Sequence, residues 1–260
     1  MATVPCRLIT MQPTERFSGL AGLYQKSRPG YPEAAIDFVL EHCRLSGLSL
    51  IADVGCGTGI ASRIFAARGI QVIGIEPNDD MRSTAESHIE SPPNLIYKKA
   101  AAEATGLDAA SLDAVLAAQA FHWFNAAAAL QEFHRILKPG GFVVLMWNER
   151  DTGDQFTKEY GSLFESMSEG FSIDQWKGAV GQPLLESNLF TNAARHAFSN
   201  AQEMDLEGLL ARAFSASYAP RHGERREQLK DGLQSLFSKF EQNGHVILVY
   251  TTSVYVAQKT

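Results

Sequence analysis

The chain has 260 residues and a formal net charge of −6, with 23 Lys and Arg against 29 Asp and Glu. This acidic balance argues against a nucleic-acid partner, because proteins that bind nucleic acids usually carry a basic face. An apolar content of 45% and a charged content of 20% are typical of a folded globular chain and exclude disordered and fibrous classes. No run of about 20 apolar residues occurs, so we expect no membrane partner.

The cysteines indicate the compartment. Cys6, Cys43 and Cys56 are odd in number and far apart, which fits free thiols in a reducing cytoplasm better than a disulfide framework. The first ten residues lack a long apolar run with a cleavage site, so a secretory signal is not expected. Because neither CxxC nor HExxH spacing occurs, we expect a cytoplasmic protein without a metal site.

Short apolar runs alternate with amphipathic stretches from residue 49 to residue 148. The apolar runs predict strands at 50–54, 71–75, 94–99, 112–118 and 142–147. Between them, helices are expected from residue 60 to a C-cap at Gly69, from an N-cap at Asn78 to residue 88, and over 126–137. Strands that are apolar on both faces and alternate with helices predict a parallel sheet covered by helices on each side.

The pattern changes beyond residue 151. Helical spacing of apolar residues follows over 156–167, 206–214 and 229–240. The chain then closes with 245–257, which is rich in Val, Ile, Tyr and Thr and predicts a strand, with 195–204 as its sheet partner. No linker rich in Pro, Gly or Ser divides the halves, so we expect the last part to complete the same sheet and to place a helical cap over its carboxyl edge.

A glycine-rich segment, DVGCGTG at residues 53–59, lies where the first strand of this pattern meets a helix. Ligands of open α/β sheets bind outside the carboxyl ends of the strands, and glycines there let a ligand approach the backbone closely. The dinucleotide spacing G-x-G-x-x-G/A fails, because Gly59 comes two residues after Gly57 and Ile60 follows it. A P-loop would need Gly-Lys-Ser/Thr, which the segment lacks.

Two acids narrow the ligand class. Glu76 ends the second predicted strand, where a carboxylate can accept hydrogen bonds from both hydroxyls of a ribose. Asp53 places a negative charge beside the loop, which would repel a phosphate and favour a cation. The sequence therefore predicts a nucleoside without phosphates that carries positive charge, and S-adenosylmethionine (SAM) fits that description.

At these residues the chain resembles the class I SAM-dependent methyltransferases, over about residues 17–151. Four segments carry the likeness: residues 53–59, Ile75-Glu76-Pro77, Ala102-Glu103-Ala104 and Lys138-Pro139-Gly140-Gly141. The chain departs from the family at Ala101, where the family often has an Asp. The likeness implies a Rossmann-like, doubly wound sheet of seven strands, mostly parallel with an antiparallel C-terminal strand. It also implies a cofactor site formed by Asp53, Gly55, Cys56, Gly57, Gly59, Glu76, Pro77, Ala102 and Glu103.

Two further segments are similar to the small-molecule branch of this family that includes trans-aconitate methyltransferase. They are Phe17…Tyr24…Arg28-Pro29-Gly30-Tyr31-Pro32 and AQAFHWF at residues 118–124. The resemblance implies that residues 1–48 fold over the cofactor, with Tyr24 and Arg28 at the methionine carboxylate. Arginine suits that task because its fork presents paired donors to a carboxylate. We expect one methyltransferase domain over 1–260, with the SAM-binding core at 49–150 and the cap and last strands at 151–260.

For three residues the sequence leaves two possible roles open. Met81 is either an adenine contact or a packing residue, and Gln119, at the end of the fourth predicted strand, contacts either the cofactor or the substrate. His122 is a candidate base because its unperturbed pKa is about 6.5. The alternative for His122 is a histidine that lines the cleft and either packs on Trp123 or binds the edge of the adenosine.

The predicted function is SAM-dependent transfer of a methyl group to a small-molecule acceptor, a carboxylate or a hydroxyl. A carboxylate is already anionic and needs no base, whereas a hydroxyl or an amine would use His122 or Tyr31 as the catalytic base. The alternative is a SAM-binding regulatory protein without catalysis, because the same glycine loop would serve both. The oligomeric state is left open between a monomer and a homodimer.

Overall fold

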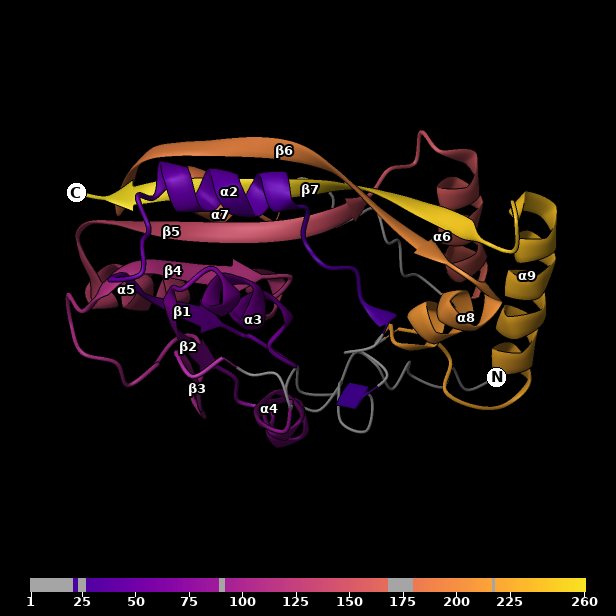
Figure 1. The fold of residues 1–260 in the computed structure, drawn as a ribbon, viewed down its shortest axis with the longest axis horizontal. Coiled ribbons are helices and arrows are strands. Elements are labelled where there is room, and N and C mark those ends of the chain that lie inside the picture. The colour runs from indigo at the N-terminus through magenta and orange to yellow at the C-terminus, as the bar shows by residue number, and fades with distance from the viewer. Residues whose placement is uncertain (1–20, 23–26, 89–91, 168–179, 217) are drawn as a thin grey trace, which may run out of the picture.

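The computed structural model describes residues 21–22, 27–88, 92–167, 180–216 and 218–260. Its centre is a seven-stranded sheet with the strand order β3-β2-β1-β4-β5-β7-β6 (Figure 1). The strands are β1 (Leu50–Val54), β2 (Gln71–Ile75), β3 (Leu95–Lys98), β4 (Leu112–Ala118), β5 (Leu137–Arg150), β6 (Phe190–Met204) and β7 (Val246–Lys259).

Strand direction confirms the predicted fold class. All pairings among β1 to β5 are parallel, and β7 runs antiparallel to both of its neighbours, β5 and β6. From β1 the chain moves to β2 and β3 on one side and returns to β4 on the other. The topological switch point, where ligands of open α/β sheets bind, therefore lies at the carboxyl ends of β1 and β4.

Helices cover both faces of the sheet. Successive residues of a strand point to opposite faces, so Leu116 packs in the apolar cluster with α2 and α3, whereas Val115 packs with α5 and α7 on the other face. The helices are α2 (Glu33–His42), α3 (Ile60–Ala67), α4 (Asp79–Glu86), the 3₁₀ turn η3 (Phe121–Trp123), α5 (Ala126–Ile136), α6 (Gln155–Met167), α7 (Gln182–Leu185), α8 (Leu206–Phe214) and α9 (Glu224–Phe240).

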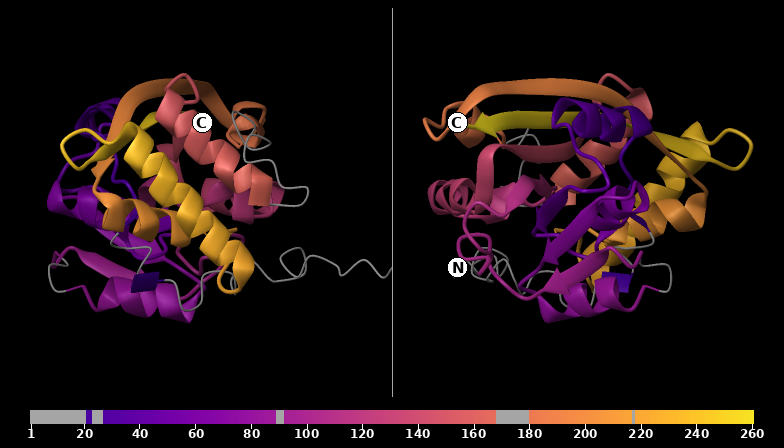
Figure 2. Two further views of the ribbon diagram at one scale, coloured as in Figure 1. Left: turned by 90° about the vertical axis from the view of Figure 1, so that its right-hand side faces the viewer. Right: turned by 60° about the vertical axis from the view of Figure 1, so that its left-hand side comes forward.

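The last two strands of the sheet carry the predicted helical cap. β5 ends at Arg150, opposite Tyr250, and beyond that point β7 pairs with β6 alone. Helices α6, α8 and α9 gather around this extension at one end of the molecule (Figures 1 and 2). They form a third apolar cluster, in which Phe156 and Leu209 are buried with Leu248 of β7. The cap thus lies beside the carboxyl end of β5.

Several element boundaries differ from the prediction. β5 begins at Leu137, directly after α5, because Leu137 already pairs with Leu112. A register shift and the positive φ of Gly140 (+79°) then carry the strand through the Lys138–Gly141 segment that was expected to be only a turn. β6 begins at Phe190 rather than near residue 195, and α9 begins at Glu224 with a polar first turn that has no apolar spacing to announce it.

The structure bears on two of the expectations about the compartment, those for the cysteines and for membrane-spanning segments. Cys43 and Cys56 are free thiols and both are buried, whereas Cys6 lies outside the described residues. Within the ranges that the structure describes, no helix is both long enough and apolar enough to cross a membrane. The cytoplasmic location and the division at residues 49 and 151 stay predictions.

Candidate functional site

The loop after β1 is held in a left-handed backbone conformation by three glycines. The φ angles of Gly55, Gly57 and Gly59 are +70°, +56° and +78°, a region that residues with a Cβ rarely adopt. The amides of Gly55 and Cys56 both donate to the carbonyl oxygen of Ile75, at 2.8 and 3.1 Å. The loop is thereby tied to the end of β2.

The three glycines differ in what surrounds them. A Cβ on Gly55 would lie 2.6 Å from the Cβ of Ala120, and one on Gly59 would lie 2.2 Å from the hydroxyl of Tyr97. A Cβ on Gly57 would meet no atom within 4 Å. Gly55 and Gly59 are therefore required by the packing of the protein, whereas Gly57 faces open space and presents bare backbone to a ligand.

Glu76 connects this loop to the segment after β2. Its Oε2 accepts a hydrogen bond from the amide of Gly57 at 2.9 Å, and its Oε1 accepts one from the amide of Asn78 at 2.8 Å. Burial raises the pKa of Glu76, and these two amides oppose that rise. Because each carboxylate oxygen has two acceptor positions, Glu76 shapes the loop and retains acceptor capacity for the hydroxyls of a ribose.

Asp53 lies beneath the loop instead of lining it. The residue has no exposed surface, its Oδ2 accepts a hydrogen bond from the Ser62 hydroxyl at 2.5 Å, and its Oδ1 has no hydrogen-bond partner. Burial raises the pKa of Asp53 to about 7, Ser62 opposes that rise, and the negative charge of Glu76 adds to it. Two acids behind one loop favour a cationic ligand over a phosphate.

The residues expected near the adenine follow β2 and β3, which are neighbours in the sheet. Pro77 follows Glu76 directly, and Met81 is buried in the first turn of α4, whose predicted N-cap Asn78 accepts the Met81 amide. Ala102 and Glu103 lie in a turn after β3. The Glu103 carboxylate accepts a hydrogen bond from the backbone N–H of Asn125, the residue just before α5, at 2.7 Å.

Gln119 has an unusual backbone for a residue that is not glycine. Its φ angle is +58°, and its amide donates to the carbonyl oxygen of Met146 at 2.8 Å. A left-handed residue with a Cβ costs about 1–2 kcal/mol, and such strain concentrates at functional sites. The strain falls at the carboxyl end of β4, the switch point of the sheet.

His122 lies in η3, directly after β4. Its ring centroid is 4.5 Å from that of Trp123 and 5.7 Å from that of Trp147. Burial lowers the pKa of His122 to about 4, and the positive charge of Arg28 contributes to the decrease. The imidazole is therefore neutral at physiological pH and a weak base, and its ring lies tilted against that of Trp123.

The N-terminal segment reaches the site through Arg28 and is anchored by asparagines. Arg28 donates from Nη2 to the carbonyl oxygen of Ser215 at 3.3 Å. The carbonyl oxygen of Gly30 accepts the side-chain amides of Asn148 and Asn200 at 3.0 and 3.1 Å. Tyr31 packs against the apolar cluster shared by α2 and α3. Tyr24, expected beside Arg28, lies outside the described residues.

Sequence reasoning missed residues that support the site from a distance. Ser62, which holds Asp53, gives no local signal beyond its helical position, and Tyr97, which lies against Gly59 and Gly74, looks like any strand tyrosine. Asn148 and Asn200 come from β5 and β6 and meet only in the folded sheet, where their side chains hydrogen-bond to each other at 3.1 Å. Only Asn78 had a signal, as a predicted N-cap.

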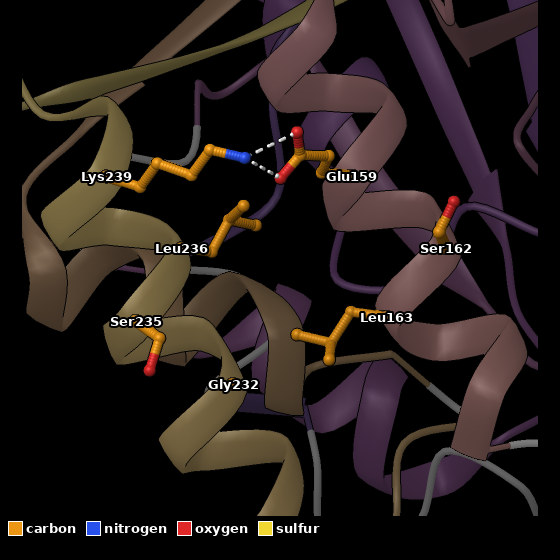
Figure 3. Close-up of a pocket in the computed structure, with 7 residues that line it drawn as sticks. All are labelled: Glu159, Ser162, Leu163, Gly232, Ser235, Leu236 and Lys239. Carbon is orange, nitrogen blue, oxygen red and sulfur yellow. Dashed lines mark hydrogen bonds and ion pairs between the residues drawn. The ribbon is translucent and has the colours of Figure 1, made fainter.

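A separate hollow of about 450 Å³ lies between α6 and α9 (Figure 3). Across it, Lys239 Nζ lies 2.8 Å from both carboxylate oxygens of Glu159. It is lined by Glu159, Ser162, Leu163, Gly232, Ser235, Leu236 and Lys239. It shares no residue with the glycine loop, so it is not the cofactor site.

We expect Gly57→Ala to weaken SAM binding, because the new methyl group enters the space that the ligand would fill. Gly69→Ala is a matched control: Gly69 has φ +86°, open space around its Cβ position, and lies at the end of α3. Each variant loses about 1–2 kcal/mol of stability, because alanine at a positive φ is strained. Calorimetric titration with SAM should show weaker binding only in Gly57→Ala; equal affinity in both variants would remove Gly57 from the site.

Glu76→Ala should weaken SAM binding by about 1–3 kcal/mol, since hydrogen bonds to a charged group are lost at both the loop and the ligand. Glu86→Ala, an exposed acid on the neighbouring α4, is the control and should bind SAM like the parent chain. Calorimetry on the two variants measures the difference. Unchanged affinity in Glu76→Ala would contradict the ribose role.

Comparison with known proteins agrees with this geometry. Residues 52–145 match a family model described as a methyltransferase domain. An uncharacterized methyltransferase of Mycobacterium tuberculosis is 31% identical over 202 residues, which cover 78% of this chain and 76% of the relative. An uncharacterized methyltransferase-like protein of Schizosaccharomyces pombe is 26% identical over 242 residues, 91% of this chain and 92% of the relative.

Solved structures show the same fold. A putative type II methyltransferase from Anaeromyxobacter dehalogenans superposes with a TM-score of 0.62 at 21% identity, covering 89% of this chain and 97% of that one. The glycine loop, the acid that ends β2 and the matched relatives agree on one assignment. The chain belongs to the class I SAM-dependent methyltransferases, enzymes whose methyl donor is SAM.

Proposed function

We propose that the protein transfers the methyl group of SAM to a carboxylate oxygen of a small-molecule acceptor. The observation that carries the choice of acceptor is the state of His122. Burial and the charge of Arg28 lower its pKa to about 4, so this histidine is a poor proton acceptor at neutral pH. An acceptor that is already anionic needs no base, which fits a site whose candidate base is weak.

Different residues of the chain bind different parts of SAM. In this proposal, Glu76 accepts the ribose hydroxyls, the open backbone at Gly57 lies against the nucleoside, and Met81 and Ala102 contact the adenine. Arg28 and Tyr24 hold the methionine carboxylate, as in the branch that the N-terminal segment resembles. The cap and the N-terminal segment exclude water, so that orientation supplies much of the rate enhancement.

When bound, SAM would supply an electrophilic methyl group on a cationic sulfur, and its transfer to a carboxylate oxygen would leave neutral S-adenosylhomocysteine and release no proton. The protein itself contributes by positioning the acceptor. The strained backbone of Gln119 directs the start of η3, and the His122 ring lies against Trp123 beside the Arg28 charge. A neutral imidazole there can position an acceptor oxygen by hydrogen bonding without taking a proton.

Two other functions compete with this one. A hydroxyl acceptor would need His122 or Tyr31 to take a proton, and Tyr31 packs on an apolar cluster. A SAM-binding regulator without catalysis would use the same loop and would show no turnover. The resemblance of residues 118–124 to the branch of trans-aconitate methyltransferase, whose named substrate is a carboxylate, favours the first proposal.

The acceptor class is tested by methyl transfer from tritiated SAM to matched panels of small carboxylic acids, phenols, alcohols and amines. We expect turnover on carboxylates. With a carboxylate acceptor and saturating SAM, kcat should change less than about twofold between about pH 5.5 and about pH 8, because both the carboxylate and the neutral imidazole keep their states there.

A kcat that rises through this range and loses its rise in His122→Asn would show that His122 acts as a base and would contradict the proposal. Tight SAM binding with no turnover on any panel would favour the regulator.

A further inference from the structure

A cluster of arginines and tyrosines joins the carboxyl end of the sheet to the cap. Arg150 is the last residue of β5, and its guanidinium lies 5.5 Å from the ring centroid of Tyr160 on α6. Arg212, on α8, donates from Nε to the hydroxyl of Tyr250 on β7 at 3.3 Å. Tyr218 follows α8 and receives a hydrogen bond from Arg150. None of these contacts belongs to the cofactor loop.

Among the described residues, neither guanidinium group has an acidic partner to balance its charge. Arg212 is 6% exposed, and among the residues that the structure describes, neither the buried Nη1 of Arg212 nor the buried Nη1 of Arg150 has a hydrogen-bond partner. Arginine does not lose its charge in proteins, and a buried charge is normally paired.

The electrostatics of Tyr218 show where these charges converge. Burial alone would raise the pKa of its phenol, but Arg150, Arg212 and Arg28 together lower it below the ordinary value. Three positive charges therefore act on one hydroxyl. Arg28 acts on His122 as well, so the positive cluster adjoins the end of the site where the acceptor is expected.

Carboxylate and phosphate groups match such a cluster. A planar guanidinium presents paired donors to either oxyanion, and the cation–π contact with the Tyr160 ring holds the Arg150 guanidinium at the cap. A purely structural role would explain the contact between Arg150 and Tyr160 and the hydrogen bond from Arg212 to Tyr250. It would not explain two buried N–H groups on separate elements that both lack an acceptor.

We propose that Arg150 and Arg212 bind an oxyanion of the methyl acceptor, a carboxylate or a phosphate that does not itself receive the methyl group. The inference rests on the proposed function, since it adds a second anionic group to the small-molecule acceptor. It makes the cap the part of the chain that selects acceptors with two anionic groups over those with one.

The first test needs no turnover. Thermal unfolding of the intact protein is followed in sodium succinate, sodium phosphate and sodium chloride at matched ionic strength. We expect succinate or phosphate to raise the Tm of the parent chain above that in chloride, and the more effective salt identifies the oxyanion. The rise should disappear in Arg150→Gln and in Arg212→Gln and persist in Arg225→Gln, a control at an exposed arginine of α9.

No rise in the parent chain, or a rise that both cluster variants retain, would overturn the proposal. Arg150 is only half-buried, so Arg150→Gln gives the result if Arg212→Gln does not fold.

The second test uses turnover and separates this inference from the proposed function. Against a dicarboxylate that the parent chain methylates, KM should rise about tenfold or more in Arg150→Gln, since charge-assisted hydrogen bonds are lost. SAM affinity and the KM for a monocarboxylate should stay within about twofold. Methylation of monocarboxylates with no preference for dicarboxylates would overturn the inference and leave the proposed function intact; turnover on phenols or amines alone would overturn both.

Discussion

The structure of this site depends on one carboxylate, that of Glu76, which joins the glycine loop after β1 to the segment that follows β2. Glu76 accepts the amides of Gly57 and Asn78 at the same time, and thereby fixes the loop after β1 against the turn into α4. The left-handed backbone at Gly57 keeps its place because that amide has a buried, charged acceptor. The interaction that stabilises the loop is also the one that leaves acceptor capacity for a nucleoside.

Side chains packed against the glycine loop, and the buried Asp53 beneath it, determine where a ligand can approach the loop and which charge it can carry. Tyr97 from β3 lies against Gly59 and Gly74, and Ala120 and Phe124 lie against Gly55, so side chains pack on both of these loop glycines and leave the Cβ position of Gly57 open. The buried Asp53, with a pKa raised to about 7, contributes charge and no surface. A ligand that brings positive charge toward this loop stabilises the ionised form of Asp53, whereas a phosphate would oppose it.

The sequence allowed the core and the position of the glycine loop to be predicted because their signals are local. The strand at 50–54, the glycine spacing and the N-cap at Asn78 each occupy a few consecutive residues. The cluster of Arg150, Arg212 and Tyr218 had no such signal, since β5 and α8 are far apart in the chain and meet only through the extension of β6 and β7. The low pKa of His122 likewise depends on burial that its neighbours in sequence do not reveal.

The most direct test of the cofactor loop is a crystal structure of the protein grown with S-adenosylhomocysteine, the product nucleoside. The account predicts this compound over Gly57, with both ribose hydroxyls within hydrogen-bond distance of the Glu76 carboxylate. Crystals in which the product lies elsewhere, or in which a diphosphate compound binds over Gly57 in its place, would contradict it.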